Sequence, residues 1–454
     1  MPAPSASPAV RSLVAIPLVA FAAIGALGFW FHSYAPLQLS TLLPVVYGLV
    51  VFSLGAWFYG RPAEAEAALA IDDSELPLVS VLIPAHNEEA VIANTLEHVL
   101  RLDYPRFEVL VIDDHSHDRT SEVVSQFPGV LLVQRRNLPN RGKSEALNAG
   151  LEFASGAVIC VFDADTEMAP DFLRKAVAPL MNDPTVCGVQ AQVRIYNRRE
   201  NLLAHCQDDE FALFNEILQT GRTRLGLAAA LGGNGQLTRR SAVEAVGGWN
   251  PGSLTEDLDL TMRLLLAGCG RIYHVTEAVV WQEGVTTMSG LIRQRQRWAE
   301  GMLRSYADYV AATVKSPQLT LGMRADAVYV LLSCFFPLMT VLGLMFQLAS
   351  YVPGAITHAL PYHFGDALSF VIIGFSVVWS LTISWKRERR LDVLPGLRYL
   401  VYLLHWVPAL MVAVRNVLTD RKVVWAKTEH RGHVGAFAPR PSLPSPPVPV
   451  RQEA

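Results

Sequence analysis

Long apolar runs flank a central region of the chain in which charged residues are frequent. The runs cover residues 12–31 and 37–59 before the central region, and residues 325–352, 367–385 and 399–414 after it. A run of about twenty apolar residues is long enough to cross a hydrocarbon core ~30 Å thick. The pattern therefore predicts two transmembrane helices near the N-terminus and a second membrane region near the C-terminus.

The same pattern divides the chain into five parts. They are an N-terminal membrane region (1–75), a folded domain (76–304), an interfacial segment (305–324), a C-terminal membrane region (325–418) and a cytoplasmic tail (419–454). The tail is rich in proline, and we expect it to be disordered from about residue 438.

Lysine and arginine residues set the expected orientation. A basic cluster directly follows residues 367–385, whereas the segments 32–40 and 353–366 contain neither residue type. Because cytoplasmic loops are enriched in Lys and Arg, a multi-pass protein of the cell (inner or plasma) membrane with a cytoplasmic central domain is expected. Pro408 interrupts the last apolar run, so that run is expected to be re-entrant or interfacial.

Short apolar strands alternate with helical patterns in the central domain. Strands are predicted at 79–83, 107–112, 130–133 and 157–162, and helices at 88–100, 120–127 and 143–153. Continuous apolar strands separated by helices indicate a parallel sheet covered on both faces, which is an α/β fold. Ligands of such sheets bind beyond the carboxyl ends of the strands.

Acidic residues occupy these carboxyl ends. Asp113 and Asp114 follow the second strand, and Asp163 and Asp165 follow the fourth. Two carboxylates at i and i+2 lie on the same side of an extended chain, where they repel each other unless a cation lies between them. Such hard oxygen ligands suit Mg²⁺ or Mn²⁺, which are often shared with substrate phosphates. A solvated loop with turn-forming Asp residues is the alternative interpretation.

Two further motifs follow the acidic ones. Thr255, Glu256 and Asp257 precede leucines at helical spacing, so Thr255 is the expected N-cap, and capping alone would explain the acidic residues. A Gln-Arg-Gln-Arg-Trp sequence ends at Trp298, where Arg297 could neutralise a diphosphate and the indole could pack against a sugar ring. A solvated basic helix face is the alternative for this second motif.

Composition narrows the classes of function. Charged residues make up 17% and hydrophobic residues 51% of the chain, against ~25% charged residues in a typical soluble protein, which argues against a disordered protein. A net charge of −3 gives no sign of a nucleic-acid-binding face. Five cysteines without a Cys-x-x-Cys pair exclude a disulfide scaffold and a zinc ribbon.

Taken together and in this order, the motifs resemble those of the membrane-embedded family 2 glycosyltransferases, which include cellulose, hyaluronan and poly-N-acetylglucosamine synthases. The matching segments are Ile83-Pro84-Ala85-His86-Asn87-Glu88, Asp113-Asp114, Asp163-Ala164-Asp165, Thr255-Glu256-Asp257 and Gln294 to Trp298. The resemblance implies a Rossmann-like GT-A domain with flanking transmembrane helices. It also implies hexosyltransferase activity that depends on Mg²⁺ or Mn²⁺.

The resemblance further implies roles for individual residues. Asp257 would be the catalytic base, and Asp163 and Asp165 would hold the metal ion. The substrate would be bound by Pro84, Asn87, Glu88, Asp113, Asp114, Lys143, Asp163, Glu256, Gln294, Arg297 and Trp298. One departure is His115, which stands where the family usually has glycine in an Asp-Asp-Gly-Ser sequence.

We therefore expect inverting, processive transfer of a sugar from a nucleotide-sugar, usually a UDP-sugar, to a growing β-linked polysaccharide. The alternative is a non-processive enzyme that adds sugars to a membrane lipid. A transporter with a nucleotide-sensing domain is a third hypothesis, which the lack of internal acids or bases in the apolar runs disfavours. The expected partners are the donor, a saccharide or lipid acceptor, membrane lipid and, in some members, an accessory subunit, but no nucleic acid. The sequence leaves open the sugar, the linkage and the oligomeric state.

Overall fold

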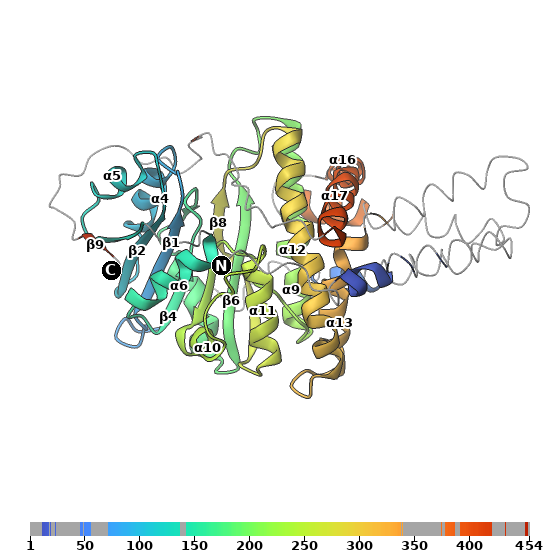
Figure 1. The fold of residues 1–454 in the computed structure, drawn as a ribbon, viewed down its shortest axis with the longest axis horizontal. Helices are drawn as coiled ribbons and strands as arrows, with labels where there is room; N and C mark the ends of the chain where they lie inside the picture. The colour runs from blue at the N-terminus through green and yellow to red at the C-terminus, as the bar shows by residue number, and fades with distance from the viewer. Residues whose placement is uncertain are drawn as a thin grey trace, which may run out of the picture.

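The computed structural model shows an α/β domain with a layer of helices beside it (Figure 1). The residues that it describes are 11–17, 19, 23, 46–48, 50–55, 71–136, 142–336, 338, 374, 377–385, 391–419, 432 and 450–452. The predicted division into five parts stays a prediction. One helix, α12 (Met288–Lys315), runs without a break through the predicted boundary at residue 304.

The expected location in a membrane is contradicted by the structure. Among the described residues, no helix is both long enough and apolar enough to cross a bilayer. The predicted runs at 12–31, 37–59, 325–352 and 367–385 lie partly outside the described residues. The run at 399–414 is described, and it is divided between α16 (Leu394–Tyr402) and α17 (Trp406–Leu418) by a 3-10 turn. Pro408 lies in the first turn of α17, where proline is tolerated.

Nine strands of the described chain form one mixed sheet in the order β5-β8-β6-β7-β4-β1-β2-β3-β9. Their bounds are β1 (Val79–Ala85), β2 (Phe107–Asp114), β3 (Val130–Arg135), β4 (Val158–Val161), β5 (Glu167–Met168), β6 (Val186–Ile195), β7 (Gln236–Arg239), β8 (Arg271–Gln282) and β9 (Val450–Gln452). The four predicted strands are β1 to β4, and they are parallel as expected. Strand β7 runs antiparallel to both β4 and β6, so the sheet is mixed rather than purely parallel.

Helices cover both faces of the sheet, as the apolar strands predicted. Helices α4 (Ile92–Val99), α5 (Thr120–Val124) and α7 (Phe172–Asn182) pack on one face through side chains such as Leu96 and Leu173. Helices α6 (Lys143–Phe153), α10 (Arg240–Ala245) and α11 (Glu256–Leu266) pack on the other face, with Leu147 and Leu260 in its core. Burying these side chains fixes the sheet between two apolar layers.

A second group of helices lies beside the sheet (Figure 1). The chain passes through α8 (Leu202–Phe211), a π-helical segment (Ala212–Leu218) and α9 (Gln219–Arg224) before it returns to the sheet at β7. Helix α12 then packs against α13 (Leu321–Leu332) and α17. Residues 294–302 of α12 lie at the carboxyl ends of the strands, which is the edge where the sequence predicts a site.

The expected disorder of the tail stays a prediction. Residues 450–452 form β9, which pairs with β3 at the edge of the sheet. The rest of the tail, apart from Gly432, lies outside the described residues.

Candidate active site

A cavity of about 400 Å³ opens at the carboxyl ends of β1, β2 and β4. Its walls also include the first turns of α6 and α11 and one side of α12. Eleven predicted residues line it: Pro84, Glu88, Asp114, Lys143, Asp163, Asp165, Glu256, Asp257, Gln294, Arg297 and Trp298. The structure thus brings together motifs that are up to about two hundred residues apart in the sequence.

Asn87 and Asp113 are not among the residues that line the cavity. The Asn87 Oδ1 atom accepts from the backbone N–H of His117 at 2.8 Å. The Asp113 Oδ1 atom accepts from the backbone N–H of Ser116 at 3.0 Å, and its Oδ2 accepts from the Ser121 hydroxyl. Both side chains therefore brace the turn after β2, and their predicted contact with substrate stays a prediction.

Asp114 is buried at the end of β2, and its charge is balanced by Arg135 of the neighbouring strand β3. Arg135 Nη1 donates to its Oδ1 at 2.6 Å, and the backbone N–H of Gly142 donates to its Oδ2 at 2.7 Å. The next residue, His115, has a φ of +62°. This left-handed conformation explains why glycine is usual there, since a side chain adds strain.

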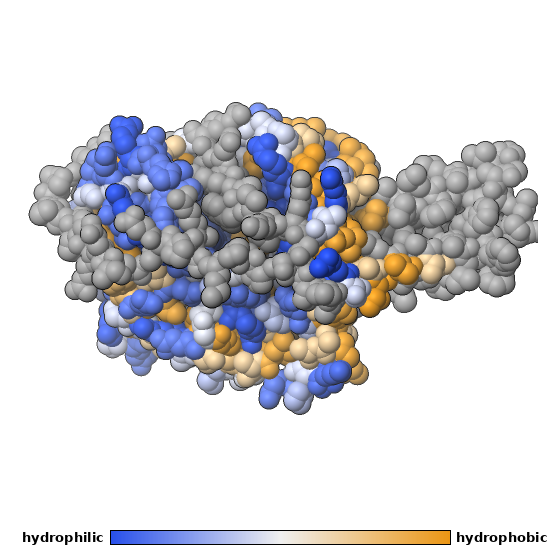
Figure 2. All heavy atoms as spheres, viewed as in Figure 1, coloured by the Kyte–Doolittle hydropathy of each residue, from blue (hydrophilic) through white to orange (hydrophobic). Residues whose placement is uncertain are grey.

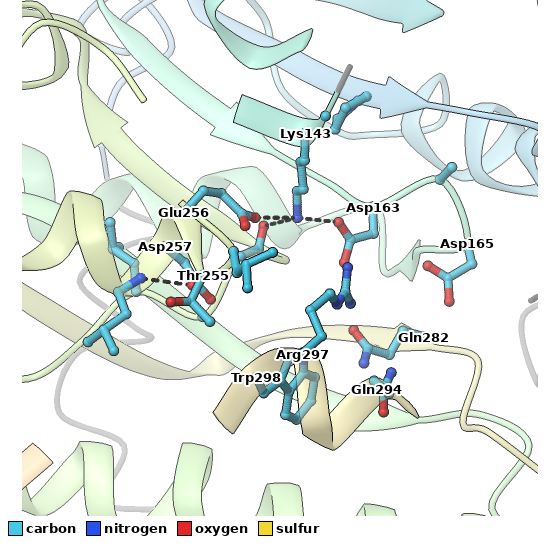
Figure 3. A pocket seen from close by; sticks show the side chains of 18 of the residues that line it. Lys143, Asp163, Asp165, Thr255, Glu256, Asp257, Gln282, Gln294, Arg297 and Trp298 are labelled. Carbon is cyan, nitrogen blue, oxygen red and sulfur yellow. Dashed lines mark hydrogen bonds and ion pairs between the residues drawn. The ribbon is translucent and has the colours of Figure 1, made fainter. Parts of the chain in front are cut away.

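Lys143 is the central cation of the cavity (Figure 3). Its Nζ lies 2.6 Å from Asp163 Oδ1 and 3.0 Å from Glu256 Oε1. Burial alone would lower the pKa of Lys143, but the two carboxylates outweigh burial and raise it. The ammonium therefore stays charged between the two acidic motifs and joins the first turn of α6 to the first turn of α11.

Asp257 lies in the first turn of α11, beside Glu256. Burial and the negative charge of Glu256 raise the pKa of Asp257 to about 7, against the opposing effect of Lys143. Thr255 occupies the N-cap position as predicted, but its side chain makes no capping hydrogen bond. It packs instead against Gly301 of α12, where an added Cβ would lie 2.5 Å from Thr255 Cγ2.

The backbone of Gly233 lies close to the side chains of Asp257 and Lys143. Its φ is +79°, and an added Cβ would lie 3.2 Å from Asp257 Oδ2 and 3.4 Å from Lys143 Nζ. Only glycine combines this conformation with so close an approach. The loop between α9 and β7 therefore forms one wall of the site through its backbone.

Helix α12 supplies the side of the cavity opposite Lys143. Arg297 and Trp298 lie next to each other there, and Arg297 is directed toward Asp163 (Figure 3). Burial lowers the pKa of Arg297, while the charges of Glu256, Asp163 and Asp257 raise it less. A diphosphate between Arg297 and Lys143 would meet two cations, which is the arrangement that anion binding needs.

Asp163 and Asp165 both line the cavity, and their role as metal ligands stays a prediction. Asp165 Oδ2 accepts from the backbone N–H of Glu283 at 2.8 Å, which fixes its position. Within the described part of the chain, no group of three or more His, Cys, Asp or Glu side chains is arranged to hold a metal ion. The donor set therefore fits a divalent cation only if substrate phosphate oxygens complete its coordination, as is common for Mg²⁺ and Mn²⁺.

Several lining residues were not predicted from the sequence. They are Phe211, Asn215, Gln282, Glu283, Met302 and Val330, among others. Gln282 and Glu283 stand at the end of β8, so the rule that ligands bind at strand ends could have found them. The apolar residues carried no such signal, because they occur at the spacing of ordinary buried helix positions.

The sequence profile described as "Glycosyltransferase like family 2" matches residues 77–301. The chain is 33% identical over 401 residues to the beta-monoglucosyldiacylglycerol synthase of Nostoc sp., a match that covers 85% of this chain and 82% of the relative. It is 32% identical over 234 residues to the poly-beta-1,6-N-acetyl-D-glucosamine synthase of Staphylococcus aureus, covering 51% of this chain and 56% of that relative.

The fold is similar to that of a solved mannosyltransferase from Pyrobaculum calidifontis in complex with GDP-Man and Mn²⁺. The TM-score is 0.56 at 19% sequence identity, and the match covers 85% of this chain and 99% of the other. At this identity the likeness concerns the GT-A-like fold alone. It agrees with the GT-A fold that the resemblance to family 2 glycosyltransferases implied.

Proposed function

This chain belongs to the family 2 glycosyltransferases, and from that premise we propose that it transfers a sugar from a nucleotide-sugar to a hydroxyl group of a glyceride lipid. The enzyme is a nucleotide-sugar glycosyltransferase; the acceptor, the metal and the residue roles below are the proposal. The observation that carries it is the cavity in which Asp257 lies together with the cations Lys143 and Arg297 (Figure 3).

The donor's diphosphate lies between Lys143 and Arg297 in this proposal. Both side chains are fixed cations in a largely buried site, where their effect on a developing negative charge is strong. Asp163 and Asp165 would hold Mg²⁺ or Mn²⁺ beside the diphosphate, and this ion would add positive charge as the leaving group departs. The nucleoside end lies toward the carboxyl ends of β1 and β2, near Pro84 and Asp114.

The transfer is a single in-line displacement. An acceptor hydroxyl attacks the anomeric carbon, and its proton passes to a carboxylate oxygen of Asp257. The bond from the anomeric carbon to the phosphate oxygen breaks, and its electron pair stays on the diphosphate. The configuration is inverted, so an α-linked donor gives a β-linked product. A base with a pKa near neutrality suits this step.

The comparisons favour a lipid acceptor over the processive polysaccharide synthesis that the sequence motifs suggested. The similarity to glucosyldiacylglycerol synthases extends over 85% of the chain, whereas the similarity to the polymer synthase extends over 51%. The longer match includes more residues than the 225 between positions 77 and 301 that the family profile covers. It therefore reaches beyond the catalytic domain.

The walls of the cavity support the same acceptor. The donor side is lined by charged residues, but Leu258, Met302 and Val330, which belong to one apolar cluster, form an apolar wall between α11, α12 and α13. Exposed apolar side chains also gather over α16, α17 and residues 11–17 (Figure 2). An apolar wall would desolvate a glyceride chain favourably, whereas a sugar polymer needs polar partners.

The test is an assay of purified protein with a panel of UDP-sugars and with Mg²⁺, Mn²⁺ or EDTA. Diacylglycerol in detergent and oligosaccharides serve as alternative acceptors. We expect a glycosylated lipid that extracts into organic solvent, formed only with a divalent cation. A product that lengthens with time and stays in the aqueous phase would support the polysaccharide hypothesis instead.

Met302→Gln tests the apolar wall directly. The polar amide should raise the KM for diacylglycerol about tenfold, which is ~1.4 kcal/mol, and should affect the slow hydrolysis of the donor much less. Met288→Gln is the matched control, because Met288 begins the same helix but is exposed. Equal effects of the two substitutions would remove the wall from the proposal.

A further inference from the structure

A buried ion pair lies directly behind the cavity wall that carries Trp298. Arg295 of α12 is completely buried, and its Nη2 donates to Glu210 Oε2 at the end of α8. One residue of α16 and one of α17 also contact Glu210. The Tyr402 hydroxyl donates to Glu210 Oε2 at 2.9 Å, and Trp406 Nε1 donates to Glu210 Oε1 at 3.1 Å.

The guanidinium of Arg295 also lies against Trp298. Its Cζ is 4.0 Å from the centroid of the indole, which is within the distance of a cation–π interaction. Phe211, the residue after Glu210, meets Trp298 edge to face at 6.5 Å between ring centroids. One face of the indole is therefore held by the ion pair, and the side chain borders the cavity.

An ion pair at this place has no clear advantage for stability. Removing two charges from water costs several kcal/mol, and apolar residues of similar volume often stabilise a core as well or better. A charged pair does fix orientation, because a carboxylate that binds a planar guanidinium allows its plane only a few orientations. Because the guanidinium of Arg295 lies against Trp298, the ion pair also fixes the orientation of the indole plane.

We propose that Glu210 and Arg295 are positioning residues that fix the indole plane of Trp298, and through it the acceptor beside Asp257. The kinetic part rests on the proposed function, whereas the orientation of Trp298 does not. A series of contacts links the C-terminal helices to the acceptor site. It leads from Tyr402 and Trp406 to Glu210, from Glu210 to Arg295, and from Arg295 to Trp298. Through these contacts α16 and α17 would take part in acceptor recognition. None of the first four residues needs to touch a substrate.

The first measurement is spectroscopic and needs no acceptor. The difference between the near-ultraviolet circular dichroism of the wild-type protein and of Trp298→Phe isolates the signal of this indole. We expect that signal to be reduced at least twofold in Glu210→Gln and in Arg295→Lys, since lysine keeps the charge but not the planar stack. An unchanged signal in both variants would overturn the proposal.

Asp208→Asn is the matched control. Asp208 is buried on the same helix and pairs with Arg198 at 3.2 Å, but it is not linked to Trp298 by any contact described above. Its substitution should change thermal stability without changing the Trp298 signal. If Glu210→Gln does not fold, Tyr402→Phe removes one hydrogen bond to Glu210 and leaves the ion pair in place, and a smaller change of the same sign is expected.

The second measurement is kinetic. Glu210→Gln should raise the KM for the lipid acceptor about tenfold and change the KM for the donor less than twofold. In a Trp298→Leu background the same substitution should have no further effect, because it acts through the indole. Additive effects, or equal changes in both KM values, would contradict the proposal. Absence of any lipid transfer by the wild-type protein would instead refute the proposed function, and the spectroscopic result would stand.

Discussion

At the residue scale, the carboxylates that line the site outnumber the cations that could balance their charge. Lys143 lies between Asp163 and Glu256, and Asp257 is left next to Glu256 without an ion pair of its own among the described contacts. Burial, together with the negative charge of Glu256, therefore raises the pKa of Asp257 to about 7. Near neutral pH, a change in a neighbouring charge therefore alters the fraction of Asp257 that is ionised.

The dependence of transfer on pH should therefore reveal Glu256. Only ionised Asp257 can accept a proton, so kcat should fall as the pH falls through about 7. Glu256→Gln removes the neighbouring negative charge and lowers the pKa of Asp257, so the fall should move to lower pH by roughly one unit. The profile of kcat against pH at saturating substrates measures this.

The magnitude of kcat in Glu256→Gln is not the test, because Glu256 also binds Lys143. Glu244→Gln is the control for a carboxylate that is exposed and paired with Arg240 on the surface. It should leave the midpoint in place. A midpoint that stays fixed, or rises, in Glu256→Gln would show that Asp257 is not the titrating base.

At the scale of elements, the approach of α12 to α11 sets the geometry of the site. Gly301 allows α12 to contact Thr255, and this contact holds Arg297 across the cavity from Lys143. The sequence signalled both helices but not their contact. A glycine inside a helical pattern is equally consistent with a weak point in the helix, and nothing in one sequence shows which residue it meets.

Gly301→Ala tests this contact, because the contact decides whether the substitution stabilises or destabilises the protein. Alanine in place of glycine inside a helix normally stabilises by up to ~1 kcal/mol. Here the added methyl group would meet Thr255 at 2.5 Å, so we expect a loss of about 1–3 kcal/mol and a lower kcat. Thermal unfolding and kinetics of the purified variant measure both.

A second substitution makes the test specific. Thr255→Ala removes Cγ2 and Oγ1, the two atoms nearest to the new methyl group, so the double variant should recover most of the lost stability. Stabilisation by Gly301→Ala alone, as in an ordinary helix, would mean that the two helices are not in close contact.

At the scale of the whole molecule, the sequence predicted the catalytic domain better than its surroundings. Strands β1 to β4 and the acidic residues at their ends followed from apolar runs that stop at Asp113 and Asp163. The antiparallel β7 was not predicted, since strand direction depends on partners that are distant in the sequence. The ion pair of Glu210 and Arg295 was also missed, because its members are 85 residues apart and neither stands at a strand end.

The expected membrane location was the largest error at this scale. Apolar runs satisfied a length criterion, but the described part of the chain contains no helix that meets the criteria of length and apolar character together. The predicted run at 399–414, whose backbone is described throughout, is divided by a 3-10 turn between two short helices. Hydropathy alone does not reveal where a helix breaks.

The most direct test of the central claim is to compare wild-type protein with Asp257→Asn in the transfer of labelled sugar from UDP-glucose to diacylglycerol. Donor binding is measured on the same samples. Loss of the base should lower kcat by about 10²–10⁴-fold, while the Kd for the donor changes less than a few-fold. A variant that transfers at the wild-type rate, or one that no longer binds the donor, would contradict the assignment of Asp257 as the base that activates a lipid hydroxyl.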